Sequence, residues 1–535
     1  MGEEGGGRSC GTTRELQKLK QQAMEYYREN DVPRRLEELL NSTFYLQPAD
    51  VYGHLANCFS KLAKPPTICK VVGKNVLDGL GLPTLQVEIF CTIQNFPKNI
   101  CSVVISTHFE VHENASRELV EAEELERLDA VSTAVQWVNE TITEELQGLV
   151  PSDQAEVDQV LRTFFENKVQ EDKERKELEK NLEDSTVLSP QPPPPPPPSK
   201  KKGQKQGRME TAAEKPIIPA EPPEPVLCGS MAIGAVSLAV AKTSAVLDNN
   251  PLYLNIALLK HHQEQPEKLT IPLLMVSLVS CGKSSPGKLN LMKEVICIPH
   301  PGLTAKQSPP PKPEMRKSHD GGKRGQSKGK YEVMMGTYKN AAEMVDLYVD
   351  LINKFPSITA LIDPFRKEDS EQWDSIYNAL GSRCYIIAGT ASKSISKLLE
   401  EGNISILKYS GLIIKHTNQT TMSDLVEITN LIDGKKHIAV FGTTEGESSD
   451  DSLVDLAVGL GVRFIKLGGL SRGERVTKYN RLFTIEEELG QNGTLGFNEE
   501  HTFFNWNEEA EKAGELPEVP EPIFPTQVAE ELAKL

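Results

Sequence analysis

The sequence predicts an α/β protein whose larger part is a (β/α) barrel, preceded by a smaller α+β domain and a helical extension. Strand and helix signals alternate from Leu269 onward, which is the pattern of parallel strands joined by helices. Two alternating segments joined by a polar turn at 94–99 precede them. Residues 461–490 read as a short β-branched strand, a glycine turn and a helix with Ser471 at its N-cap and Glu474 three residues on.

Composition excludes several classes of protein. A chain of 535 residues with 38% apolar residues can form several domains and one large core. Its longest apolar run, 231–241, is shorter than the roughly 20 residues that span a membrane. The first residues lack a secretory pattern, and the 9 cysteines contain no CxxC pair, so we expect reduced thiols and a cytoplasmic protein. A net charge of -17 argues against nucleic-acid binding.

Residues 1–65 form the predicted helical extension, with helical spacing in 12–28, 34–41 and 48–62. In the first helix one face carries Leu16, Leu19, Ala23 and Tyr26. Helices this short cannot bury such a stripe alone, so they must dimerise or dock. The order LEELLN, loop, QPADVYGHLANCFSKL is similar to dimerisation-and-docking helices that bind an amphipathic anchor helix. The alternative is a helical cap packed on the chain's own domain.

The predicted α+β domain comprises 70–169 and 226–265, interrupted by an insert at 170–225. The insert begins with the charged run EDKERKELEKNLED and continues into a proline run at 192–198 and the basic stretch KKKGQKQGR. Such a composition cannot pack a core, so we expect the insert to be disordered. The prolines could serve as an SH3-type ligand and the lysines as a targeting patch, but composition favours a solvated linker.

The predicted barrel spans 266–505 and is followed by an acidic tail at 506–535. Its expected strands are 273–279, 294–298, 359–362, 385–388, 405–407, 437–441 and 462–467. The expected helices of the later part are 341–354, 370–380, 422–431 and 453–460. The stretch 300–330 has linker composition, so part of the barrel is expected to be missing, which would leave strand edges unpaired.

The run 461–490, with Arg472, Arg475 and the segment KYNRLFTIEEELG, closely resembles the last strand and helix of the enolase family. The resemblance covers roughly 70–505. It implies an enolase-like fold, dehydration of 2-phosphoglycerate to phosphoenolpyruvate in glycolysis, Mg²⁺ as cofactor and a homodimer. The helical extension and the proline-rich insert resemble a divergent vertebrate type of enolase that is associated with sperm and its flagellum.

Three charged residues match the family's active site. The resemblance implies that Lys408, in SILKYSG, is the catalytic base. It also implies that Lys466 holds the substrate carboxylate and that Glu294 lies beside the leaving hydroxyl. Both lysines fall at the C-terminal ends of predicted strands, where barrel enzymes build their active sites.

The family's metal-ligand positions fall at Ile362 and Gly389, and neither side chain can coordinate Mg²⁺, which takes oxygen ligands. The neighbouring Asp363 is expected to point to the opposite face of its strand. No metal ligands are therefore assigned, and the third family aspartate belongs to the missing arc.

Other family positions also differ. The phosphate-binding loop reads GTTE, with Thr444 and Glu445 in place of arginine and serine. The active-site histidine falls near Ser284 or Ser285, and 106–116 lack the small-residue lid motif. These losses predict that the dehydration is weak or lost.

Two hypotheses follow. The chain is an enolase with 2-phosphoglycerate as substrate, or it is a catalytically inactive scaffold that acts through its N-terminal helices or a mixed dimer with an enolase.

Overall fold

The computed structural model describes residues 9–105, 117–186, 226–280, 292–307, 318–321, 331–334, 337–389, 394–402, 408–443, 447–470, 472–501 and 503. The chain divides into two compact units. The first comprises Met1–Thr67 with Thr92–Lys98, and the second comprises Ile68–Cys91 with Asn99–Leu535. The predictions for Ser284, Ser285, Thr444, Glu445, the strand at 405–407 and the tail at 506–535 concern residues outside the described ranges.

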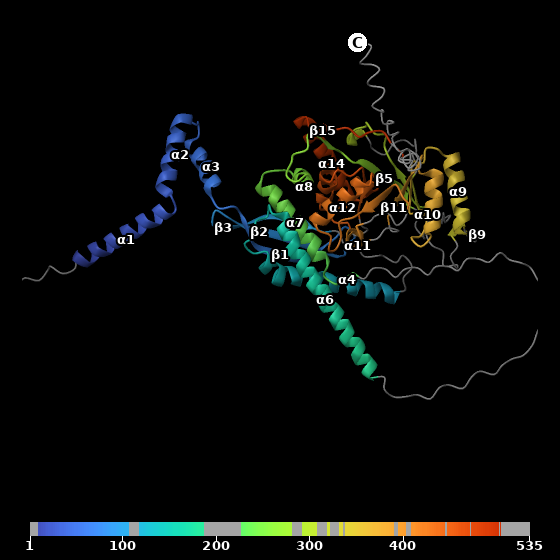
Figure 1. The fold of residues 1–535 in the computed structure, drawn as a ribbon, viewed down its shortest axis with the longest axis horizontal. Helices are drawn as coiled ribbons and strands as arrows, with labels where there is room; N and C mark the ends of the chain where they lie inside the picture. The colour runs from blue at the N-terminus through green and yellow to red at the C-terminus, as the bar shows by residue number, and fades with distance from the viewer. Residues whose placement is uncertain are drawn as a thin grey trace, which may run out of the picture. The chain divides into compact units, whose positions relative to one another are not determined.

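Three helices make up most of the first unit: α1 (Ser9–Glu29), α2 (Val32–Leu46) and α3 (Val51–Leu62), drawn in blue in Figure 1. They cover the segments in which helical spacing was expected. Asp50 caps α3 by accepting a hydrogen bond from the Gly53 nitrogen at 2.9 Å. Little of the unit's apolar surface is buried, since α3 contains no buried residue and Thr43 is the buried residue of α2.

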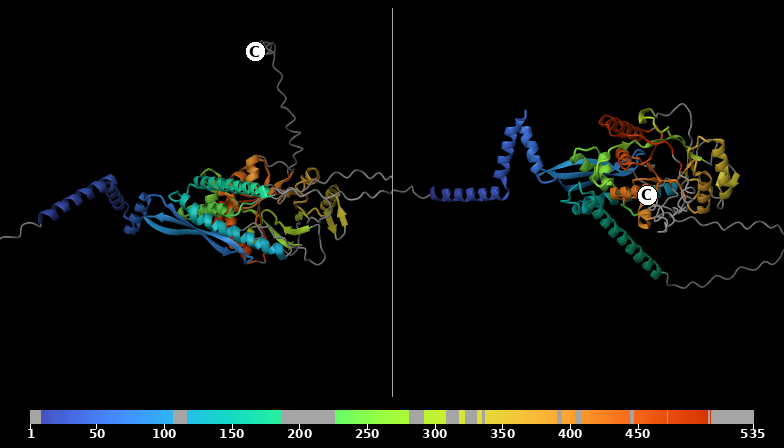
Figure 2. Two further views of the ribbon diagram at one scale, coloured as in Figure 1. Left: turned by 90° about the horizontal axis from the view of Figure 1, so that it is seen from below. Right: turned by 45° about the horizontal axis from the view of Figure 1, so that its top comes forward.

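Most of a three-stranded sheet belongs to the second unit, and its strand order is β1 (Thr67–Leu77), β2 (Pro83–Ile93), β3 (Phe96–Val104). The helices of this part of the unit are α4 (Arg117–Trp137), the π-helical turn Val138–Ile142, α5 (Thr143–Glu145), α6 (Gln154–Thr186), α7 (Met231–Leu247) and α8 (Leu252–Lys260). Leu85, Val87 and Ile89 of β2 are buried at alternate positions. Helices lie along the sheet (Figure 2), with Asn139 bonded to Gly73 of β1 and Cys101 of β3 to the Ala239 carbonyl of α7.

The predicted insert starts later than expected, because α6 continues through the charged run to Thr186. Opposite charges three or four residues apart stabilise a helix. Here Lys168 Nζ lies 2.8 Å from Glu171 Oε2, and Lys176 Nζ lies 2.6 Å from Asp172 Oδ2. Residues 187–225, with the proline run, lie outside the described residues.

No single helix in the described ranges has the length and apolar character needed to cross a membrane. By length and composition only, α7 and α8 together meet that requirement as a pair bent by 108°.

In the residues that the structure describes, the barrel is closed by eight strands in the order β10-β11-β12-β13-β14-β5-β6-β7. Their bounds are β5 Leu273–Ser280, β6 Met292–Cys297, β7 Ser318–Gly321, β10 Ala360–Ile362, β11 Tyr385–Ala388, β12 Gly411–Ile414, β13 Ile438–Gly442 and β14 Phe464–Gly468. Neighbouring strands are parallel except that β6 is antiparallel to both β5 and β7. The predicted fold class, an α+β domain followed by a (β/α) barrel, is confirmed.

Helices and short strands surround the barrel. The helices are α9 (Ala341–Lys354), α10 (Ser370–Leu380), α11 (Ile395–Glu401), α12 (Met422–Gly434), α13 (Ser452–Gly459) and α14 (Gly473–Asn492). The short strands pair outside it, β4 (Leu269–Thr270) with β15 (Leu495–Gly496) and β8 (Tyr331–Met334) with β9 (Thr337–Lys339), and a 3-10 turn covers Ala305–Gln307. Helices α9 and α10 lie next to each other in Figure 1.

Two details of the barrel correct the prediction. The linker-like stretch 300–330 contributes the short strand β7, which pairs with β6 on one side and β10 on the other. The shortened arc therefore does not leave the barrel open, and the expected unpaired edges do not form. The prediction also missed β12, which begins at Gly411, after the expected strand 405–407.

Candidate active site

The interior of the barrel is filled by alternate residues of its strands. The core cluster contains Leu273 and Met275 of β5, Ile296 of β6, Ile362 of β10, Ile387 of β11, Val440 of β13 and Phe464 of β14, with Ile413 of β12 packed against it. Side chains on a strand alternate between faces, so the next interior positions are found two residues further along. At the C-terminal ends of the parallel strands these are Gly389, Lys415, Gly442 and Lys466. We call this set the mouth layer.

Two predicted site residues meet at the mouth layer. The Lys466 ammonium lies 2.7 Å from one Glu294 carboxylate oxygen, and both side chains are mostly buried. The Ser277 hydroxyl donates a hydrogen bond to the other oxygen of Glu294. Glu294 reaches this end of the barrel because β6 runs antiparallel to its neighbours, so that its first residues lie beside the last residues of β5.

Lys408 is not where the prediction placed it. The residue is exposed and precedes β12, which runs parallel to β11 and β13. Lys408 therefore lies toward the N-terminal edge of the barrel, whereas Lys466 lies within β14 at the mouth layer. The lysine at the mouth layer is Lys415, directly after Ile414, and it is half-buried. A Cβ atom placed on Gly442 would lie 3.7 Å from the Lys415 Cε atom, and Gly442 is in register with Lys466.

A sequence signal for Lys415 exists but is ambiguous. The apolar runs ISIL (404–407) and GLII (411–414) are each followed by a lysine, seven residues apart. Either run could form the barrel strand, and the hydrogen-bonded register with β11 and β13 selects the second.

The two expected metal positions lack oxygen ligands, as their residue types require. Ile362 is 1% exposed and belongs to the barrel core. At Gly389 the space for a side chain is taken, because a Cβ atom there would lie 3.0 Å from Asp363 Oδ2 and 3.1 Å from Ile413 Cδ1. Among the residues that the structure describes, no three His, Cys, Asp or Glu side chains are grouped closely enough to hold a metal ion.

Asp363 also differs from the prediction. Its backbone has a left-handed φ of 47°, which ends β10 and redirects the side chain. The carboxylate accepts a hydrogen bond from the Gly389 nitrogen at 2.8 Å and lies on the interior side of the barrel, not on the opposite face. Mg²⁺ is usually held through one or two carboxylates together with waters and substrate oxygens, and the two carboxylates that the family supplies here are replaced by an isoleucine and a glycine. The residues present therefore do not fit the family's magnesium site.

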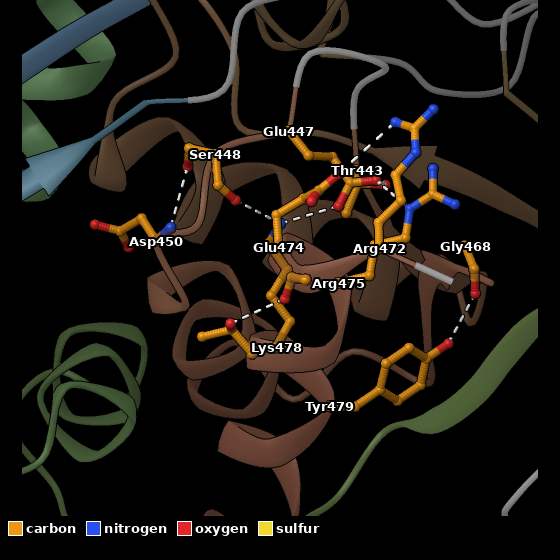
Figure 3. Close-up of polar contacts among 12 residues, drawn as sticks. Thr443, Glu447, Ser448, Asp450, Gly468, Arg472, Glu474, Arg475, Lys478 and Tyr479 are labelled. Carbon is orange, nitrogen blue, oxygen red and sulfur yellow. Dashed lines mark hydrogen bonds and ion pairs between the residues drawn. The ribbon is translucent and has the colours of Figure 1, made fainter. Parts of the chain in front are cut away.

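A buried charge cluster that the sequence did not indicate lies between α14 and the segment after β13 (Figure 3). Glu447 and Lys478 are each 1% exposed, with Lys478 Nζ 2.9 Å from Glu447 Oε2. Arg475 Nε lies 2.9 Å from the other oxygen of Glu447, and Lys478 also donates to the Ser448 carbonyl at 3.0 Å. These contacts join the segment after β13 to α14. Arg475, one of the two arginines of the family motif in 461–490, therefore forms a structural ion pair with Glu447.

The start of α14 differs slightly from the expected capping box. The helix begins at Gly473 with Arg472 at the N-cap position and no side-chain cap, while Ser471 lies outside the described residues. The Tyr479 hydroxyl instead ties the helix to β14 by donating to the Gly468 carbonyl at 2.8 Å.

A second buried polar group connects the α+β domain to the barrel. Asp158 of α6 accepts hydrogen bonds from the hydroxyls of Ser237 and Ser423, each at 2.6 Å, and from the Ser423 nitrogen at 2.9 Å. Burial raises the pKa of the Asp158 carboxyl, against the opposing effect of these donors. The contact fixes the N-terminus of α12, the helix that follows β12 and Lys415.

An α+β domain, a closed barrel with one antiparallel strand and a lysine–glutamate pair at its mouth define the enolase class of barrel proteins. A family model described as "Enolase, C-terminal TIM barrel domain" matches residues 321–502. The chain is 73% identical to "Enolase 4" of Homo sapiens, over all of this chain and 99% of the relative, and 46% identical to "Enolase 4" of Xenopus laevis, over 92% and 95%. The chain therefore belongs to the enolase family, and the resemblance to its divergent vertebrate type is confirmed.

The similarity to other enolases is more limited in extent. The "Enolase" of Bifidobacterium longum (strain NCC 2705) is 34% identical over 162 residues, which cover 30% of this chain and 37% of the relative. The alignment with the human relative spans 619 positions, whereas this chain has 535 residues. The human relative thus carries residues that have no counterpart in this chain.

Proposed function

We propose that this chain is an enolase-like protein in which the family's magnesium-dependent dehydration of 2-phosphoglycerate is weak or lost. The observation that carries the proposal is the pair Ile362 and Gly389 at the family's metal positions, where a core isoleucine and the Asp363 carboxylate occupy the space. The reaction builds up negative charge on the substrate carboxylate, and metal ions normally stabilise it.

The residues that remain can still contact an anionic substrate. We assign to Lys466 the substrate carboxylate, and to Glu294 the position beside the leaving hydroxyl. The base is assigned to Lys415 in place of Lys408, because Lys415 follows the C-terminal end of β12 and Lys408 precedes that strand. Two lysines supply less positive charge than two divalent ions and two lysines together, and Lys466 is already engaged by Glu294. We therefore expect the chain to bind 2-phosphoglycerate although it dehydrates this substrate slowly or not at all.

The test is dehydration of 2-phosphoglycerate by purified protein across a Mg²⁺ titration. Lys415→Ala is the variant, and Lys408→Ala is the matched control on the same segment of chain. Little turnover, equal in all three proteins, is the expected result. Magnesium-dependent turnover that is lost in Lys415→Ala and kept in Lys408→Ala would overturn the proposal and identify a working enolase.

A scaffold or docking role is the second candidate, and the exposed apolar surface of the first unit favours it. Phe44 and Tyr52, for example, are 70% and 85% exposed. An amphipathic anchor helix or a mixed dimer with an enolase would supply the partner, in the cytoplasm and the sperm flagellum. Binding of a labelled amphipathic helical peptide that survives Lys415→Ala and is lost on deletion of residues 1–65 would support this role. Binding that is unaffected by the deletion would contradict it.

A further inference from the structure

Helix α1 carries an apolar seam with heptad spacing. Leu16, Leu19, Ala23 and Tyr26 are separated by three, four and three residues, which places Leu16 and Ala23 at heptad positions a and Leu19 and Tyr26 at positions d. The seam is open to solvent, with Leu16 70%, Leu19 64% and Tyr26 62% exposed. Apolar a and d residues over these two heptads are the pattern by which a helix pairs with another helix.

In the described part of the first unit, the seam residues remain exposed. Of the exposed large apolar side chains in the part of the chain that the structure describes, half belong to residues 16–62. Among them, α1 contributes Leu16, Leu19, Met24, Tyr26 and Tyr27. This helix therefore presents apolar surface to a partner.

The charges that flank the seam identify the partner. Glu15 occupies position g of one heptad and Lys20 occupies position e of the next. In a parallel, in-register pair of identical helices, residue g of one helix faces the following e residue of the other. Glu15 of each copy then faces Lys20 of the other copy, which gives two attractive contacts. We propose that α1 forms a parallel, in-register two-helix coiled coil with α1 of a second copy of this chain.

The antiparallel arrangement is disfavoured by the same charges. When two α1 helices are aligned antiparallel about the middle of the seam, like positions flank each other. Lys20 then lies beside Lys20 of the second copy, and Glu15 lies near Glu29. Both contacts are repulsive, so the charge pattern selects the parallel pair.

Disulfide trapping on the full chain tests this arrangement directly. Leu19→Cys places a thiol at position d, where identical residues face each other only in a parallel, in-register pair. Gln21→Cys, at the outer position f of the same helix, is the matched control, and the unmodified chain reports crosslinking through native cysteines. Under mild oxidation by glutathione disulfide, Leu19→Cys is expected to form a covalent dimer in at least fivefold excess over both controls. Equal yields at the two positions, or no dimer, would overturn the proposal.

Exchanging the charges of Glu15 and Lys20 in the Leu19→Cys background tests the predicted contacts a second time. Recovery of the crosslinking yield in the double variant cannot be explained by a folding defect of the single variants. Glu15→Lys and Lys20→Glu each replace attraction by repulsion and should lower the crosslinking yield several-fold. The double variant restores the pairing with exchanged signs and should recover the yield. Lys18→Glu, at the outer position c, is the control and should leave it unchanged. A double variant no better than the single ones would contradict the parallel register. These outcomes do not depend on the barrel's activity.

Discussion

The Asp363 carboxylate accepts a hydrogen bond from the Gly389 nitrogen at 2.8 Å, and its second oxygen fills the space that a side chain at Gly389 would occupy. By accepting this backbone hydrogen bond, the carboxylate joins the ends of the neighbouring strands β10 and β11. The loss of a ligand at Gly389 and the new direction of Asp363 are thus two aspects of one local structure, which leaves no room for a second carboxylate beside the first.

Replacing Gly389 by alanine should lower the free energy of unfolding by about 1–3 kcal/mol, because the added methyl group would press against Asp363 and Ile413 in a closed-packed barrel end. Chemical denaturation monitored by tryptophan fluorescence measures the change. Gly434→Ala, where an added Cβ meets nothing within 4 Å, is the control and should not be destabilised. Equal stability of both variants would show that the space at Gly389 is not filled as described.

Lys478→Ala should destabilise the protein by about 1–3 kcal/mol, since the buried Glu447 keeps Arg475 but loses its second cationic hydrogen-bond donor. The same denaturation experiment, with Asn480→Ala as an exposed control two residues away on α14, measures the effect. A loss below about 1 kcal/mol would mean that water or Arg475 compensates for Lys478. In that case the cluster would not be the clamp between α14 and the segment after β13.

Stability should fall as the pH is lowered from 7 to 5. Burial lowers the pKa of His416 to about 4, below its ordinary value, so the unfolded chain takes up a proton at this site at higher pH than the folded protein does. The stabilisation is complete above the unfolded pKa and is lost as the pH falls toward 4, at a cost of about 2 kcal/mol by pH 5. His437, whose pKa is also lowered to about 4 by burial, adds to the slope.

The comparison of unfolding free energies at pH 7 and pH 5 for the parent and His416→Gln measures this contribution. The variant should show a smaller decrease than the parent, whatever its absolute stability. An identical decrease in both proteins would mean that His416 is not buried in its neutral form.

The sequence predicted the parts of the fold that local signals determine. The strand and helix of 461–490 and the alternating strands of the barrel required only hydrophobic periodicity and turn residues, and the family motif around Arg475 was visible directly. The choice between Lys408 and Lys415 was different in kind, because two equivalent apolar runs precede them and only pairing with β11 and β13 distinguishes the runs.

The remaining differences depend on three-dimensional context. The direction of Asp363 follows from one left-handed φ angle, which an aspartate can adopt but its sequence neighbours do not require. The closure of the barrel depends on β7, a short strand inside a stretch of linker composition. Glu447 and Lys478 are 31 residues apart, so nothing local in the sequence marks them as a buried pair.

We propose that the mouth of this barrel does not hold magnesium as other enolases do. Calorimetric titration of the full chain with Mg²⁺ in the presence of saturating 2-phosphoglycerate tests it most directly, with a magnesium-dependent enolase titrated in parallel. We predict no saturable binding at magnesium concentrations that fill the reference enzyme. Saturable binding of comparable affinity, abolished by Asp363→Asn, would contradict the account, because it would show that Asp363 serves a metal ion and not the Gly389 backbone.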